Sequence, residues 1–270
     1  MPELPEVETT RVGLSPHLVW QKIVSLHIRQ RQLRWLISDQ IFQLEGEQIL
    51  SLIRRGKYLI LSTQAGHALI HLGMSGSLRI LSAAEPPTKH DHWDMVLGDK
   101  QVLRYRDPRR FGALLWTEAP PEEHKLLCDL GLEPLSEEFC GDYLFRISRG
   151  KSRPIKSFIM DSKILVGVGN IYASEALFRA GIHPQRRADR ISAKRYEILA
   201  GAIVKVLKTA ISAGGTSLQD FFTPTGEPGY FRQQLSVYGR ENQPCLRCGG
   251  IIKKKVQAQR SSYYCPNCQH

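Results

Sequence analysis

The spacing of apolar residues changes near residue 120, and this change constrains the fold more than any other feature of the chain. Before it, short apolar or alternating runs are separated by turn residues, as is typical of β-strands. These runs cover residues 22–29, 48–55, 57–63, 67–73, 77–81, 93–98, 101–106 and 111–117. Gly98-Asp99, between two of the runs, indicates a hairpin. Many short strands at close spacing predict an antiparallel sandwich or barrel.

Beyond residue 120 the apolar residues recur at helical spacing. Helices are expected over residues 120–131, 136–150, 153–162, 171–181 and 192–215. The last is the clearest, because its apolar residues follow an unbroken i, i+3, i+4 pattern. Ser192 is expected to cap it and Gly214-Gly215 to end it.

One more helix is expected at the start of the chain. Pro5 suits a first helical position, and Glu6 and Glu8 suit the positive end of the helix dipole. Gly13 or Pro16 is expected to end this helix. Helix propensity leaves Pro2-Glu3 unexplained, since both precede it.

The net charge narrows the class of partner. Lys and Arg number 37 against 26 Asp and Glu, which gives +11. Such a balance favours a polyanion, most often nucleic acid, with a merely basic protein as the alternative. The sequence has no apolar run of about 18 residues and no apolar segment after an N-terminal basic stretch. We therefore expect no membrane association and a cytoplasmic location.

Four cysteines near the C-terminus form two Cys-x₂-Cys pairs separated by sixteen residues: Cys245, Cys248, Cys265 and Cys268. This spacing suits tetrahedral Zn²⁺ in a β-hairpin ribbon, and two disulfides are the alternative. A site filled by four sulfurs leaves no open position for catalysis, so the expected cofactor is one structural Zn²⁺. The ribbon would hold Lys253, Lys254, Lys255 and Arg260 against phosphates, unless the lysines are only a solvated charge run.

Several exact strings occur in order along the chain: MPELPEVE at 1–8, RRGKYL at 54–59, HLGMSG at 71–76, DPRRFG at 107–112 and VGVGNIYASE at 166–175. With the terminal zinc ribbon they resemble the formamidopyrimidine-DNA glycosylase family, bacterial base-excision enzymes for oxidised purines. The related endonuclease VIII group usually begins with a PEGP type of string, whereas this chain has PELP.

The resemblance implies an α+β multidomain fold. Residues 1–130 would form an antiparallel β-sandwich with an N-terminal helix, and residues 131–235 a helix-two-turn-helix domain. Residues 236–270 would form a β-hairpin zinc finger. Residues 216–231 resemble the family's lesion-capping loop.

The resemblance also implies chemistry at the N-terminus. Once Met1 is removed, Pro2 offers a secondary amine that can attack C1′ of the damaged nucleotide, as lysine does in Schiff-base enzymes. Glu3 would donate a proton to the sugar ring oxygen, and Glu6 would support the site. Lys57 and Arg260 are implied as proton donors or phosphate contacts.

The remaining implied residues contact DNA. His90, Lys156, Asn170 and Tyr238 would bind phosphates. Met74, Arg109 and Phe111 would fill the gap left by the extruded nucleotide, with Arg109 pairing to the orphaned cytosine. Without the resemblance, Lys57 is a strand-edge lysine, Asn170 a helix cap, and Met74 and Phe111 core residues.

We therefore expect a bifunctional base-excision glycosylase and AP lyase acting on 8-oxoguanine and formamidopyrimidines. Its reaction would pass through a Pro2 iminium and end in β,δ-elimination. The expected partner is damaged double-stranded DNA, bound by a monomer at the bacterial nucleoid. The alternatives are an endonuclease VIII-type enzyme for oxidised pyrimidines and a non-catalytic zinc-ribbon DNA-binding protein.

Overall fold

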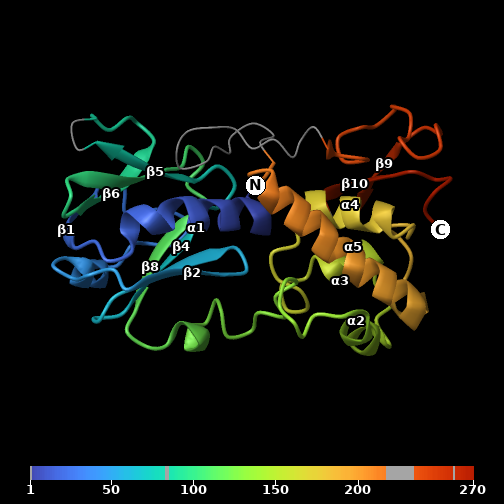
Figure 1. The fold of residues 1–270 in the computed structure, drawn as a ribbon, viewed down its shortest axis with the longest axis horizontal. Helices are drawn as coiled ribbons and strands as arrows, with labels where there is room; N and C mark the ends of the chain where they lie inside the picture. The colour runs from blue at the N-terminus through green and yellow to red at the C-terminus, as the bar shows by residue number, and fades with distance from the viewer. Residues whose placement is uncertain (1, 83–84, 217–233, 258) are drawn as a thin grey trace. The chain divides into compact units, whose positions relative to one another are not determined.

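The computed structural model describes residues 2–82, 85–216, 234–257 and 259–270 (Figure 1). Most of the predicted lesion-capping loop, from residue 217 onward, lies outside the described residues. The chain divides into two compact units: residues 1–129 with 213–230, and residues 130–212 with 231–270. The three-part division expected from the sequence stays a prediction.

The first unit contains two antiparallel sheets of four strands each. One has the order β1 (Ile23–Ile28), β6 (Asp91–Leu97), β7 (Gln101–Arg106), β5 (Ser77–Ser82). The other has the order β2 (Ser51–Arg55), β3 (Tyr58–Ser62), β4 (His67–His71), β8 (Ala113–Thr117). Each predicted strand run overlaps one of these strands, so the strand predictions are confirmed, although β6 begins two residues before its run and β5 ends one residue after its run. A short 3₁₀ helix, η1 (Asp39–Leu44), lies between β1 and β2.

The core of this unit draws side chains from both sheets and from α1 (Leu4–Leu18). Leu14 and Leu18 of α1 are fully buried there together with Leu61 of β3 and Trp93 of β6. The predicted Gly98-Asp99 hairpin is confirmed, because β6 pairs with β7 and the Lys100 N–H donates to the Leu97 carbonyl at 3.0 Å.

The prediction that α1 ends at Gly13 or Pro16 is wrong. The helix runs through both residues to Leu18. Pro16 removes the N–H that would bond the Val12 carbonyl, but Val12 is 52% exposed, so water can satisfy that acceptor. Burial of Leu14 and Leu18 outweighs the lost bond.

The second unit is helical and carries a C-terminal hairpin. Its elements are α2 (Gly141–Ser148), α3 (Ile155–Ile159), α4 (Asn170–Arg179), η3 (Ala188–Arg190), α5 (Ala193–Ser212), β9 (Lys253–Gln257) and β10 (Arg260–Tyr264). The limits predicted for α5 are confirmed, since the Arg195 N–H donates to Ser192 Oγ and Gly214 has a φ of +73°.

Three helix predictions need correction. The run 120–131 is not a helix: only η2 (Pro121–Glu123) forms, because His124 turns extended and its Nδ1 accepts the Leu126 N–H. The helix expected from residue 136 begins only at Gly141, after an extended Cys140. Asn170 is the first residue of α4 rather than its cap, which is Gly169.

In the described part of the chain, no helix is long and apolar enough to cross a membrane.

Candidate functional site

The N-terminal segment is buried and held by Glu6. Pro2 is buried, and Glu3, 2% exposed, is the N-cap residue of α1. The Glu3 N–H donates to Glu6 Oε2 at 2.8 Å, and the Thr216 N–H donates to Glu6 Oε1 at 2.8 Å. Glu6 thus joins the start of the chain to Thr216, the first residue of the predicted lesion-capping loop. Glu3 therefore has a capping position that the sequence analysis did not foresee.

Glu8 fixes α1 against the strand that leads to Lys57. Its carboxylate accepts hydrogen bonds from Arg11 at 2.7 Å and from Arg54 at 2.9 Å. Burial raises the pKa of Glu8, but these two guanidinium groups outweigh it and hold the pKa below its ordinary value. Lys57 lies half-buried in the turn between β2 and β3, two residues after Arg55.

His71, at the end of β4, is a neutral acceptor beside Lys57. Burial lowers the pKa of His71 to about 4, assisted by the positive charges of Lys57 and Arg34. Its Nδ1 accepts the Gly73 N–H at 2.9 Å, which shapes the turn that carries Met74. Gly73 has a φ of +64°, a conformation that favours glycine.

This arrangement predicts a stability that falls in acid. His71 binds a proton less readily in the folded state than in the unfolded state. The free energy of unfolding should therefore decrease as the pH falls from about 6.5 to about 4. At about 1.4 kcal/mol per tenfold change in proton affinity, this amounts to about 3 kcal/mol. Urea unfolding of wild type and His71→Asn across this interval measures it. A variant with the same pH dependence as wild type would contradict the assignment to His71.

Three gap-filling candidates lie at exposed tips of the first unit. Met74 is 37% exposed and Phe111 44% exposed, so the core interpretation of both is wrong. Arg109 is also exposed, and its guanidinium carbon lies 5.0 Å from the centre of the Phe111 ring. His90 lies half-buried between β5 and β6, and its carbonyl accepts the Asp107 N–H at 3.0 Å.

In the second unit the fold brings Asn170 and Tyr238 together. Asn170 Nδ2 donates to the Tyr238 hydroxyl at 3.4 Å, and the Tyr238 ring lies 4.9 Å from that of Tyr263 on β10. Fully buried Glu175 of α4 anchors this segment. Its carboxylate accepts the backbone N–H groups of residues 236, 237 and 238, each at 2.9 Å.

Lys156 and Arg260 line one cavity of about 330 Å³ between α3 and the hairpin. Lys156 is only 2% exposed, and its Nζ donates to the Ser261 carbonyl at 2.9 Å and to Ser262 Oγ at 3.0 Å. Arg260, the first residue of β10, is exposed. The structure thus gives Lys156 an anchoring contact with the strand that bears Arg260, and its phosphate contact stays a prediction.

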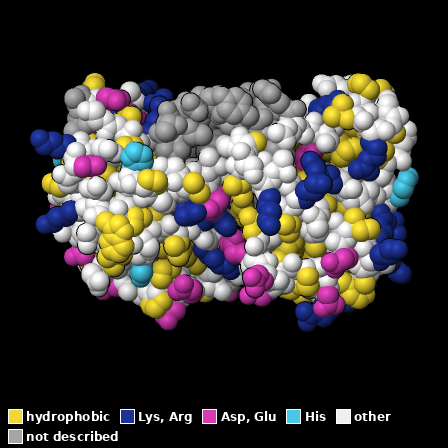
Figure 2. All heavy atoms as spheres, in the orientation of Figure 1, with side chains coloured by type: hydrophobic (Ala, Val, Ile, Leu, Met, Phe, Trp, Pro, Cys, Tyr) yellow, Lys and Arg dark blue, Asp and Glu magenta, His cyan; other side chains and the backbone are white. Residues whose placement is uncertain are grey.

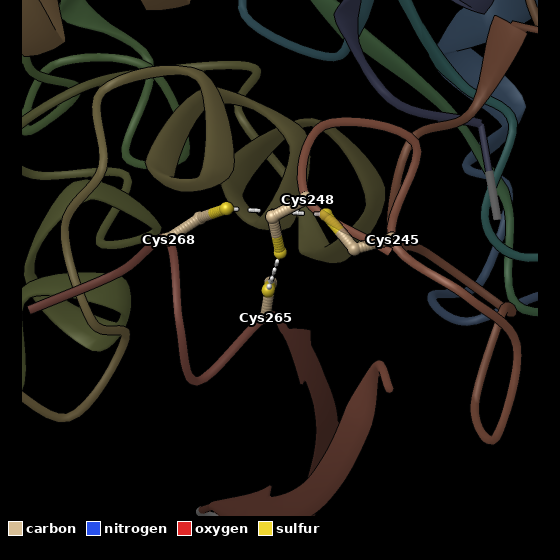
Figure 3. A group of neighbouring side chains, drawn as sticks. All are labelled: Cys245, Cys248, Cys265 and Cys268. Atoms are coloured by element: carbon tan, nitrogen blue, oxygen red, sulfur yellow. Dashed lines mark hydrogen bonds between the residues drawn. The ribbon is translucent and has the colours of Figure 1, made fainter. Parts of the chain in front are cut away.

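The four C-terminal thiols converge on one point (Figure 3). Cys245 Sγ lies 4.0 Å from Cys268 Sγ, and Cys248 Sγ lies 3.5 Å from Cys265 Sγ. A tetrahedron with Zn–S bonds of about 2.3 Å has sulfurs about 3.8 Å apart, so the thiols fit one structural Zn²⁺. Both pairs are well beyond a disulfide bond length.

The segments that flank the hairpin and carry the zinc-site cysteines pack on α4 through a small apolar cluster. Phe178 of α4 meets Val237, Ile252 and the buried Cys245 and Cys265. On the face shown in Figure 2, Lys and Arg side chains are interspersed with Asp and Glu. Net charge alone therefore does not locate a DNA-binding surface on that face.

We expect Cys265→Ser to lower DNA affinity by about 100-fold, because a structural zinc site contributes the folding energy of its finger. The β-sandwich should stay folded, since its core contains none of these residues. Filter binding, zinc content and thermal unfolding measure the three quantities. Cys128→Ser, at an exposed thiol outside the finger, is the matched control. Unchanged affinity despite zinc loss would contradict the prediction.

Three family models match successive parts of this chain, in the order sandwich, helical region and zinc-binding segment. The "Formamidopyrimidine-DNA glycosylase N-terminal domain" matches residues 1–114, and the "Formamidopyrimidine-DNA glycosylase H2TH domain" matches residues 130–222. The "Zinc finger found in FPG and IleRS" matches residues 242–270. A formamidopyrimidine-DNA glycosylase of Syntrophotalea carbinolica is 55% identical over 270 residues, covering all of both chains.

The chain belongs to the formamidopyrimidine-DNA glycosylase family. A relative of that name from Photobacterium profundum is 52% identical over 269 residues, again covering both chains fully. Among solved structures, the MutM (Fpg) protein of Thermus thermophilus has a TM-score of 0.89 at 38% identity, over 99% of this chain and 98% of its own. A Lactococcus lactis Fpg variant bound to Fapy-dG DNA has a TM-score of 0.92 at 32% identity, with full coverage of both chains.

Family membership confirms the predicted fold class: a sandwich with an N-terminal helix, an H2TH domain and a zinc-binding hairpin. Members of this glycosylase family act on damaged DNA, so the chain is a DNA-repair enzyme with one structural zinc site. The sequence analysis missed Glu175 and Asp107 as anchors. Each stood inside a recognised string, VGVGNIYASE or DPRRFG, but only tertiary contacts show what it holds.

Proposed function

We propose that the chain excises oxidised purines from duplex DNA as a bifunctional glycosylase and AP lyase, with Pro2 as its nucleophile. Full-length identity to formamidopyrimidine-DNA glycosylases supports the activity. The substrate class is supported by relatives whose structures contain Fapy-dG or carbocyclic 8-oxo-G DNA. The observation that carries the proposal is the buried terminal segment, held through Glu6 at both Glu3 and Thr216.

The proposed chemistry begins at the Pro2 amine after Met1 is removed. The amine attacks C1′, and the base leaves with the electrons of the glycosidic bond and takes up the proton that the Pro2 nitrogen loses. Glu3 protonates the ring oxygen as the sugar opens, which leaves an iminium ion on Pro2. The iminium acidifies C2′–H, so β-elimination expels the 3′ phosphate. A subsequent δ-elimination expels the 5′ phosphate.

The other site residues would hold the DNA in this geometry. Asn170 stands at the N-terminus of α4, where backbone N–H groups and the helix dipole favour a phosphate. Tyr238 shares a hydrogen bond with it. Lys57, His90, Lys156 and Arg260 are proposed as further phosphate contacts, and Lys57 and Arg260 alternatively as proton donors.

Met74, Arg109 and Phe111 are proposed to enter the space left by the extruded nucleotide. Their exposure at adjoining tips supports this role, since an insertion residue must reach the base stack. Arg109 supplies donors that can pair with an orphaned cytosine.

The endonuclease VIII alternative predicts a preference for oxidised pyrimidines. A relative from Lactococcus lactis has been solved with DNA that contains an oxidised pyrimidine, so the two substrate classes need direct comparison. Initial rates on 8-oxoguanine and thymine glycol duplexes, with borohydride trapping of the covalent adduct, test the proposal. Faster cleavage of 8-oxoguanine opposite cytosine is expected. Faster cleavage of thymine glycol would favour the alternative, and binding without any adduct would favour a non-catalytic DNA-binding protein. The monomeric state and the nucleoid location stay predictions.

A further inference from the structure

A fully buried carboxylate lies beneath the exposed tips of the first unit. Asp107 is 0% exposed, and each of its two carboxylate oxygens accepts two hydrogen bonds. Oδ1 accepts the Ser75 hydroxyl at 2.6 Å and the Arg109 N–H at 3.2 Å. Oδ2 accepts the Gly112 N–H at 2.9 Å and the Tyr105 hydroxyl at 3.1 Å.

Three of these donors, Ser75, Arg109 and Gly112, come from the two loops that carry the gap-filling candidates, and the fourth, Tyr105, belongs to β7. Ser75 directly follows Met74, and Gly112 directly follows Phe111. The Arg109 N–H also lies 3.3 Å from Ser75 Oγ, so the two loops share a bond directly as well as through Asp107. One carboxylate therefore fixes the backbone beside all three tips.

The residues packed around the Asp107 carboxylate leave it little room to move. The Tyr105 ring stacks on Trp93 at 5.3 Å between centroids, and burial with the nearby Asp107 charge raises the pKa of Tyr105, so its hydroxyl stays a donor. His92 Nε2 donates to the Asp107 carbonyl at 2.6 Å. A Cβ at Gly73 would lie 2.4 Å from the Phe111 carbonyl carbon, so the two loops meet without space between them.

We propose that the Ser75–Asp107 pair is a positioning device that holds Met74, Arg109 and Phe111 as one rigid group before DNA arrives. In doing so it sets the discrimination between cytosine and adenine opposite the lesion. This inference rests on the insertion roles given under the proposed function. A hydrogen-bond donor discriminates between bases only when its direction is fixed, and the Arg109 backbone takes its direction from this pair.

A purely structural role would predict something different. Loosening a core element should lower every activity together, including the reaction with an abasic site. A positioning role predicts that the reaction at a preformed abasic site survives while opposite-base discrimination is lost. The discrimination ratio is the single-turnover excision rate opposite cytosine divided by that opposite adenine.

We expect Ser75→Ala to lower this ratio by about 10-fold, with borohydride trapping on a preformed abasic site reduced less than about 3-fold. Ser77→Ala, which removes another buried hydroxyl two residues along, should leave the ratio unchanged. Asp107→Asn retains one acceptor oxygen but turns an NH₂ group toward two of the four donors, so it should lower the ratio as Ser75→Ala does. Asp107→Ala should reproduce or exceed this effect. Thermal unfolding establishes that each variant is folded.

Arg109→Ala separates failure of this inference from failure of the proposed function. If Arg109→Ala leaves the ratio unchanged, the insertion role of Arg109 is wrong. If Arg109→Ala lowers the ratio but Ser75→Ala does not, or if Ser75→Ala lowers discrimination and abasic trapping equally, the positioning device is wrong. The double variant should lose no more discrimination than Arg109→Ala alone, because both changes act through one side chain.

Discussion

A chain that keeps Met1, or carries one additional residue before Pro2, is expected to form no borohydride-trapped adduct with 8-oxoguanine or abasic DNA. The nitrogen of an internal proline belongs to an amide and has no nucleophilic lone pair. Only a terminal Pro2 offers the secondary amine that the proposed reaction needs. The adduct yield should fall by at least about 1,000-fold, since covalent catalysis is lost entirely.

The matched control keeps an amine and the chain length. Pro2→Gly, with Met1 removed, presents a primary amine at the same position and should trap detectably, though more slowly. Intact mass spectrometry establishes whether Met1 is present in each preparation. DNA affinity should change little among the three proteins, because the phosphate contacts proposed above lie elsewhere. If a chain shown to retain Met1 formed the covalent adduct in the same yield as the wild type, the proposed role of Pro2 would be wrong.

Glu175→Gln is expected to lower base excision by about 100-fold. Glu175 is fully buried, and its two oxygens accept three backbone N–H groups from residues 236 to 238. Glutamine keeps one acceptor oxygen, so at least one N–H would face an NH₂ group at a cost of roughly 1–3 kcal/mol. The segment bearing Tyr238 should shift, and displacements of about 1 Å can cost about 100-fold in rate.

Glu137→Gln provides the control, since it removes the same charge at an exposed position of the same unit. Single-turnover excision and DNA affinity are the measurements, with thermal unfolding alongside them. The loss should be accompanied by weaker DNA binding, because Tyr238 and Asn170 share a hydrogen bond. Full activity in Glu175→Gln would show that the three backbone contacts do not position the site.

Strand positions were predictable because short apolar or alternating runs were in most cases separated by turn residues, as at Gly98-Asp99. The residues at which helices begin and end were less predictable. Pro16 favours a helix end locally, but the burial of Leu18 and the exposure of Val12 allow α1 to continue. The run 120–131 has acidic and apolar residues suited to a helix, yet His124 takes an extended backbone and the pattern breaks there. Propensity is a weak prior, and tertiary contacts override it.

The functional site likewise has features that the sequence predicts and features that only the tertiary structure shows. The sequence by itself located the four cysteines of the zinc site, whose chemistry follows from residue type and spacing, and its family resemblance led to the proposed roles of Pro2 and Glu3. Tertiary structure alone decided what holds them. Glu6 reaches Thr216 across 210 positions, and Asp107 gathers Ser75 across 32. Buried carboxylates need several donors, and a local pattern cannot reveal donors that only folding brings within about 3 Å.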